Sequence, residues 1–160
     1  MLRRTLLALA LVAMLPAASF AGSFTAFGPH LGFSQGPNQF VIGGHLQWGD
    51  VAPQLDFVPG IDLGFGDNVT LISLNGDFHY RIQTKTTWQP YVGGGVGLHF
   101  ASFANPGFGQ NNSSTNAGGH FIAGADVATK GHSRFFAEIK LGFGDSPDFK
   151  GLAGWSFRPR

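Results

Sequence analysis

The chain contains no cysteine and little charge. Of its 160 residues, 10 are Lys or Arg and 9 are Asp or Glu, so the net charge is +1. The absence of cysteine excludes a disulfide scaffold and a thiolate metal site. A nucleic-acid-binding protein is normally basic, so this nearly neutral chain predicts no nucleic-acid partner. The charged share of 12% is about half that of soluble globular proteins.

Glycine and phenylalanine are abundant, with 25 Gly and 17 Phe. With 43% hydrophobic residues the chain does not have the composition of a disordered protein. The mean hydropathy of +0.08 is too low for a helical membrane protein, and the length suits a single domain.

Residues 1–21 have the pattern of a secretory signal peptide. Arg3 and Arg4 precede an apolar run over residues 6–15, and the small residues Ser19 and Ala21 precede a cleavage site near Ala21. Ten apolar residues cover only about half of a ~30 Å hydrocarbon core, which disfavours an N-terminal membrane anchor. The sequence therefore predicts an exported protein whose folded domain is residues 22–160 and whose membrane-spanning segments, if any, are strands.

From residue 22 onward, apolar and polar residues alternate with the period of a β-strand. Turn-forming residues divide this pattern into eight segments. The predicted strands cover residues 24–34, 39–48, 54–66, 69–82, 89–102, 118–129, 133–144 and 149–157. Most of these segments have the length of about 9–11 residues that a tilted transmembrane strand needs, or more. An even number of strands allows a closed barrel with both termini on one side, which export places in the periplasm.

The charged residues within the predicted strands all fall on the polar face, and none falls on the apolar face. The predicted interior charge network consists of Asp56, Asp62, Asp77, Arg81, Asp126, Arg134, Glu138, Lys140 and Lys150. An eight-stranded barrel is just wide enough for side chains to fill it, so these acids and bases should pair and plug the lumen. A soluble calyx of the lipocalin type would carry its charges outside instead.

Aromatic residues gather toward both ends of the predicted strands. The predicted girdles are Trp48, Tyr80, Trp88 and Trp155 at the periplasmic end, and Phe33, Phe65, Phe100 and Phe143 at the outer end. Two aromatic girdles around an apolar band are typical of a transmembrane barrel. The fold class is therefore predicted as all-β, an eight-stranded antiparallel up-and-down transmembrane β-barrel.

The chain resembles the small outer-membrane β-barrel proteins of the OmpA transmembrane-domain, OmpX and opacity-protein type. The resemblance rests on the signal peptide, the segment PYVGGGVG at 90–97, the motif LGFGD at 63–67 and again at 141–145, and GWSF at 154–157. It implies the outer membrane of a Gram-negative cell envelope, contact with lipid and lipopolysaccharide, and insertion by the barrel-assembly machinery.

The signal that this machinery reads usually ends in an aromatic residue. Trp155 and Phe157 fit its alternating pair, but residues 158–160 follow them, and Leu152 stands where Gly is usual.

Histidine and serine are the candidate catalytic or metal-binding residues. His30, His45, His79, His99 and His120 all have inward parity, but none of them has the tight spacing of a metal site, so no metal is predicted. Ser102 follows His99 by three residues, which turns the two side chains to opposite faces of a strand. Without a Ser-His-acid arrangement, we expect no catalytic residue, no cofactor and no enzyme activity.

The segment 103–117 is predicted to be the one long loop, rich in Asn, Ser and Gly. Phe103, Phe108, Asn111 and Asn112 make it a candidate binding loop. The sequence favours a structural or surface-interaction role, and it does not name the surface partner. The alternatives are a narrow small-solute channel, a lipid-modifying outer-membrane enzyme and a soluble periplasmic ligand-binding calyx.

Overall fold

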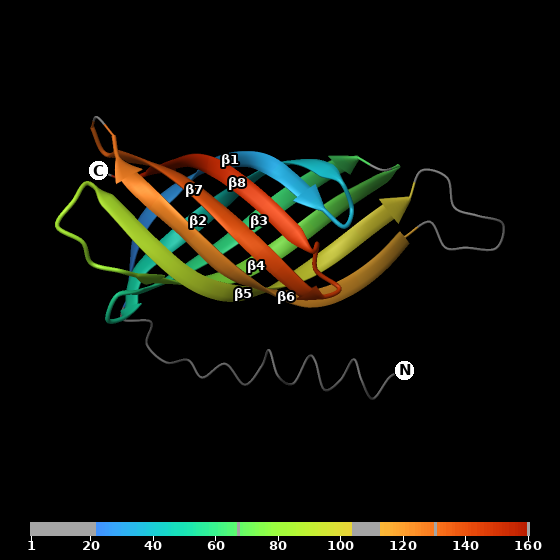
Figure 1. Ribbon diagram of the computed structural model, residues 1–160, viewed down its shortest axis with the longest axis horizontal. Helices are drawn as coiled ribbons and strands as arrows, with labels where there is room; N and C mark the ends of the chain where they lie inside the picture. Colours follow the sequence, from blue (N-terminus) through green and yellow to red (C-terminus); the bar gives the residue numbers. More distant parts are fainter. Residues whose placement is uncertain (1–21, 67, 104–112, 130, 160) are drawn as a thin grey trace.

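Eight antiparallel strands, each following the alternation of the sequence, close into a barrel in the order β1 to β8 (Figure 1). The computed structural model describes residues 22–66, 68–103, 113–129 and 131–159. The strands are β1 (Ser23–Gln35), β2 (Gln39–Ala52), β3 (Leu55–Gly66), β4 (Val69–Arg81), β5 (Trp88–Phe103), β6 (Ser113–Ala128), β7 (Ser133–Gly144) and β8 (Phe149–Phe157). The predicted fold class is confirmed for an eight-stranded up-and-down barrel. The predicted signal peptide lies outside the described residues.

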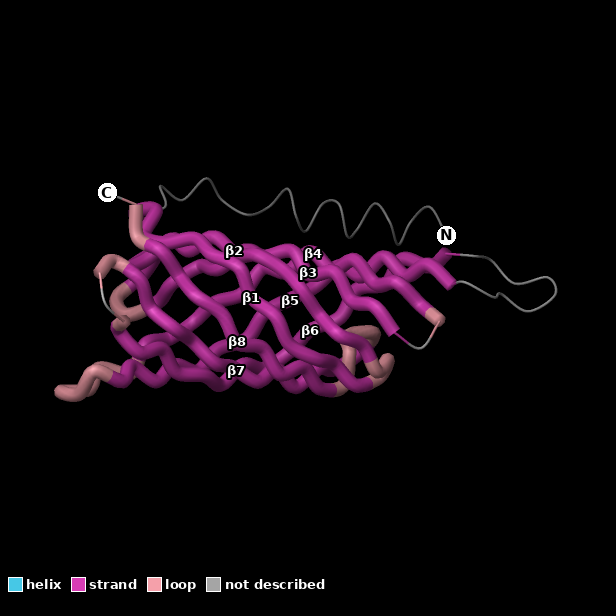
Figure 2. Tube along the Cα trace, turned by 90° about the horizontal axis from the view of Figure 1, so that it is seen from above, coloured by secondary structure: helices cyan, strands magenta, loops and turns pink. Residues whose placement is uncertain are grey.

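Each strand pairs with its neighbours along the chain, and β1 also pairs with β8, so the eight described strands form a closed ladder. The tube in Figure 2 is strand along almost its whole length, with loops only at the two ends. β1 starts and β8 finishes at the same end, which we call the termini end; the opposite one is the far end. Within the described residues, no helix is long and apolar enough to cross a membrane.

Several strands, β2, β5 and β6 among them, run further than the sequence predicts. The prediction of a loop over 103–117 is wrong at both ends, because Phe103 belongs to β5 and residues 113–117 belong to β6. These added residues are mostly Ser, Thr and Asn, which show no apolar alternation, so the pattern did not reveal that the hairpin continues. β2 likewise runs to Ala52, and Asp50 within it has a positive φ of 57° beside an irregularity in the β2–β3 pairing.

The barrel has apolar side chains outside and charged side chains inside, the reverse of a water-soluble protein. Its outer surface exposes large apolar side chains such as Leu31, Ile61 and Leu74, whereas its lumen buries charged ones such as Asp56 and Lys150. Apolar contacts also fill part of the lumen, and Val69, Leu71 and Ala101 form a cluster toward the far end. An eight-stranded barrel is just wide enough for side chains to fill its lumen, so the buried charges need partners there.

Glycine makes room for the larger side chains that point inward. A Cβ on Gly124 would lie 2.6 Å from the Tyr91 hydroxyl oxygen, and one on Gly95 would lie 2.2 Å from Asp77 Oδ1. Tyr91 and Gly124 are direct cross-strand partners, as are Asp77 and Gly95. Gly95, in the glycine-rich run of β5, and Gly124 of β6 therefore allow close packing in the lumen.

The outward face carries Gly, Ala or Pro residues near the middle of the strands. One such residue occurs on every strand: Pro29, Gly44, Pro59, Gly76, Gly94, Ala123, Ala137 and Ala153. A Cβ on Gly44 or Gly76 would meet no atom closer than 3.5 Å, so packing does not require glycine at these two positions. The outer wall thus has bulky side chains toward both ends and a slender waist between them.

Candidate functional site

The lumen contains a buried cluster around Asp62. Its carboxylate accepts hydrogen bonds from Lys150 Nζ at 2.6 Å and Asn75 Nδ2 at 3.0 Å, and lies 2.7 Å from His30 Nε2. These side chains come from β1, β3, β4 and β8, and each is less than a tenth exposed. Because Asp62 is the ion-pair partner of Lys150 among the described residues, loss of this one carboxylate leaves a buried ammonium unpaired.

A second buried cluster surrounds Asp77. Lys140 Nζ lies 2.5 Å from one carboxylate oxygen and His120 Nε2 lies 2.8 Å from the other. Lys140 also lies 3.5 Å from Glu138 Oε1, and Tyr91 donates its hydroxyl hydrogen to Glu138 Oε2 at 2.8 Å. Four strands, β4, β5, β6 and β7, are therefore tied together across the lumen by one network of ion pairs and hydrogen bonds.

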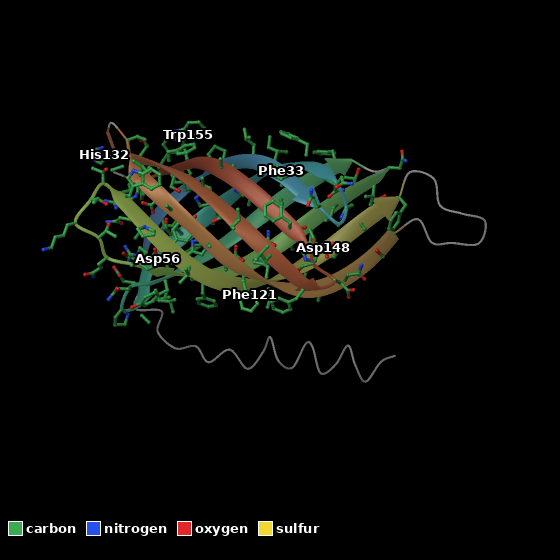
Figure 3. The ribbon with its side chains drawn as sticks, viewed as in Figure 1. Phe33, Asp56, Phe121, His132, Asp148 and Trp155 are labelled. Carbon is green, nitrogen blue, oxygen red and sulfur yellow. The ribbon has the colours of Figure 1, made fainter. Side chains whose placement is uncertain are left out.

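A third group of charges lies at the termini end, where Figure 3 labels Asp56. Asp56 is 1% exposed, accepts a hydrogen bond from Gln47 Nε2 at 2.6 Å, and lies 3.1 Å from Arg81 Nε. Arg81 also donates from Nη2 to Asp50 at 2.6 Å. Arg134 pairs with Asp126 through its Nε at 2.7 Å and also through Nη2, and that pair stands apart from the Asp62 and Asp77 clusters.

The structure thus places the predicted interior charges in the lumen in three separate groups. It adds partners that the sequence prediction did not include, namely His30, Asn75, Asp50, Gln47, His120 and Tyr91. Inward parity marked the histidines and Tyr91, but parity does not say which acid each would reach. Asp50 lies outside the predicted strand 39–48, and only the extension of β2 brings it to Arg81.

At the far end, a short turn folds into the mouth of the barrel. Ser146 and Pro147, in the β7–β8 turn, are both buried. His99 Nε2 lies 3.0 Å from Ser146 Oγ, and His99 Nδ1 lies 2.8 Å from Ser73 Oγ. Ser102 points outward, as its parity predicts.

Within the described part of the chain, both hydrogen bonds of His99 go to serine hydroxyls and neither goes to a carboxylate. His99 therefore holds the β7–β8 turn in place and lacks the acid partner of a catalytic histidine. A nucleophile would also need access to substrate, and Ser146 is only 8% exposed.

A cavity occupies the half of the lumen nearer the termini. Its volume is about 50 Å³, and charged and polar side chains from the Asp62, Asp77 and Asp56 groups line it. A buried water needs about 10–15 Å³ measured in this way, so the cavity has room for on the order of three waters. Asn75 Oδ1, His45 Nδ1 and His79 Nε2 are among the buried polar atoms on its wall that have no hydrogen-bond partner among the described residues, and such waters would satisfy these three.

The histidines lie in the lumen but are not gathered into one site. His30 and His45 stack with ring centroids 5.9 Å apart, and His79 stacks on Tyr91 at 4.6 Å. Across the described residues, no group of three or more His, Asp or Glu side chains is arranged to hold a metal ion.

Aromatic side chains form clusters on the outer wall near both ends of the barrel. Toward the termini end, Trp48 packs against Phe24 at 5.6 Å and Trp155 against Phe135 at 5.2 Å. Toward the far end, Phe33 packs against Phe149 at 5.7 Å. Tyr80, Trp88, Phe65, Phe100 and Phe143 are also exposed.

Of the candidate binding loop, Phe103 is exposed at the end of β5, whereas Phe108, Asn111 and Asn112 lie outside the described residues. For three of its four members, the structure therefore gives no position.

Comparisons with known proteins relate this architecture to a structural class. No family model matches the chain, and neither does any curated protein. Among solved structures, the crystal structure of Neisserial surface protein A superposes with a TM-score of 0.70 at 16% identity, covering 87% of this chain and 99% of that one. The N-terminal β-barrel domain of Pseudomonas aeruginosa OprF gives 0.70 at 13% identity, with 86% and 99% covered.

The chain has the fold of the small outer-membrane β-barrels. A de novo designed transmembrane β-barrel is also similar, with a TM-score of 0.54, 17% identity, and 84% of this chain and 95% of that one covered. The resemblance inferred from the sequence therefore extends to the three-dimensional arrangement of all eight strands. At these identities the comparison concerns the fold, so the role of the lumen has to be argued from its own residues.

Proposed function

We propose that this protein is an integral outer-membrane β-barrel with a structural or surface-interaction role and a lumen plugged by its own side chains. The observation that carries this proposal is the inverted polarity of the wall, with Asp62, Asp77 and Lys140 buried inside and large apolar side chains exposed outside. In water this arrangement would expose much of the apolar surface, whereas in a bilayer the same surface meets lipid.

In this proposal, residues 1–21 direct export and are removed near Ala21, and residues 22–160 form the barrel. The apolar outer wall contacts the acyl chains of outer-membrane lipid and lipopolysaccharide, with the aromatic girdles at the membrane–water boundaries. The barrel-assembly machinery inserts the chain, and a surface partner would meet the far end. No enzymatic role is proposed, since His99 anchors the β7–β8 turn through hydroxyl groups.

The location is tested by gel mobility and fractionation. We expect the mature chain, folded in detergent, to migrate differently in SDS before and after boiling, because closed membrane barrels keep their hydrogen-bonded ladder in SDS until heated. We also expect the protein in the outer-membrane fraction. An unchanged mobility together with recovery from the soluble periplasm would contradict the proposal and favour a ligand-binding calyx.

The plugged lumen is tested by electrical recording. Purified protein in a planar lipid bilayer is expected to give no discrete conductance steps, because the Asp62 and Asp77 clusters cross the lumen and the cavity between them and the termini end has room only for a few waters. A large porin recorded in the same bilayer serves as the positive control. Reproducible steps from the pure protein would replace the plug with the alternative of a narrow small-solute channel.

A further inference from the structure

The mouth of the barrel at the termini end holds a hollow that the plugged-lumen proposal does not use. We call it the vestibule. Its volume is about 310 Å³, far larger than the inner cavity. Its wall includes Arg81, Arg134 and Arg158 together with Asp50, Asp126 and Gln89. Arg81, Arg134 and Asp126 also line the inner cavity, so the vestibule lies directly against the ionic group at the termini end.

Three guanidinium groups gather in this hollow, and each carries five N–H donors. Two carboxylates, those of Asp50 and Asp126, share its wall, and a third, that of Asp56, lies beneath Arg81. Arg134 is held by Asp126 and Arg81 by Asp50 and Asp56. Within the described residues, Arg158 makes a hydrogen bond through its backbone N to His132 O at 2.9 Å and forms no ion pair, so its guanidinium is available.

One of the two carboxylates is easily displaced. The side chain of Asp50 is 72% exposed, and that of its partner Arg81 is 32% exposed. An ion pair in such an exposed place contributes little to stability, so an incoming anion can replace Asp50 at Arg81 without unfolding the barrel. Asp56, which is 1% exposed, stays beneath Arg81 and keeps its side chain in position.

We propose that the vestibule binds a small oxyanion, a carboxylate or a phosphate group, through Arg158, Arg134 and Arg81. The planar guanidinium presents two parallel N–H groups that match two oxygens of either anion. Gln89 adds an uncharged polar group to the wall. This site goes beyond the proposed function, because it requires neither conduction nor a surface partner.

The test is a titration of the folded mature chain in an uncharged maltoside detergent at constant ionic strength. Inorganic phosphate and succinate are added separately, and binding is followed by calorimetry and by the NMR signals of the arginine side chains. We expect saturable binding of at least one anion, and the anion that saturates identifies the phosphate or the carboxylate source. Chloride at the same concentration is the reference for unspecific attraction.

Matched variants locate the site. Arg158→Gln is expected to weaken binding about tenfold, since it removes a charge-assisted pair of hydrogen bonds while leaving the backbone contact to His132 in place. Lys85→Gln removes a positive charge from the adjacent β4–β5 loop, outside the vestibule, and is expected to leave binding unchanged. Heat-dependent gel mobility checks that both variants fold. Absence of saturation with both anions, or equal loss in the two variants, would overturn the proposal.

Discussion

Replacing Asp62 by Ala is expected to lower the free energy of unfolding by about 3–5 kcal/mol, the cost of leaving a buried charge without its partner. Lys150 loses the carboxylate 2.6 Å away, and His30 and Asn75 lose an acceptor at the same time. Urea titration of the barrel in lipid vesicles, followed by tryptophan fluorescence, measures this change.

Two further variants distinguish the loss of the Asp62–Lys150 ion pair from a nonspecific loss of stability. Asp145→Ala removes an exposed carboxylate in the β7–β8 turn and is expected to change stability by less than about 0.5 kcal/mol. Adding Lys150→Met to Asp62→Ala removes the stranded charge and should recover a large part of the loss. Equal urea midpoints for Asp62→Ala and Asp145→Ala would show that the buried ionic cluster contributes nothing to the plug.

The second large decrease in stability is expected when an arginine is placed on the waist of the outer wall. Ala123 faces outward near the middle of β6 and is exposed, so in a bilayer Ala123→Arg puts a guanidinium near the midplane. The expected destabilisation is about 2–4 kcal/mol. On the outside of a soluble barrel the same change would be nearly neutral, so this variant also distinguishes the membrane barrel from the calyx.

A matched control lies on the same face of the same strand. Ala117 is also an exposed alanine of β6, six residues nearer the far end, which is about 14 Å along the axis for a strand tilted by about 45°. This distance exceeds half of an apolar band about 25 Å tall, so Ala117→Arg is expected to cost about 0–1 kcal/mol. If the two arginine variants unfold alike in vesicles, the outer wall does not face a hydrocarbon core as proposed.

The faces of the strands could be predicted from the sequence, because side-chain direction in a strand depends only on parity. Asp62 and Ile61 are neighbours in the chain, yet one is 3% and the other 47% exposed, as the alternation predicts. The same rule placed His99 inside and Ser102 outside. The apolar alternation stops before residue 118 is reached from the loop side, so residues 113–117, which are polar except for Ala117, were assigned to a loop although they belong to β6.

The partners inside the lumen were decided by the tertiary structure. Lys150 reaches Asp62 across 88 positions of sequence and Lys140 reaches Asp77 across 63, and these pairings depend on the register of every strand and on the closure of β1 with β8. Ser146 lies in a turn whose sequence does not indicate that it folds inward to His99. Local alternation determined which residues share the lumen, whereas the geometry of the closed barrel decided which of them meet.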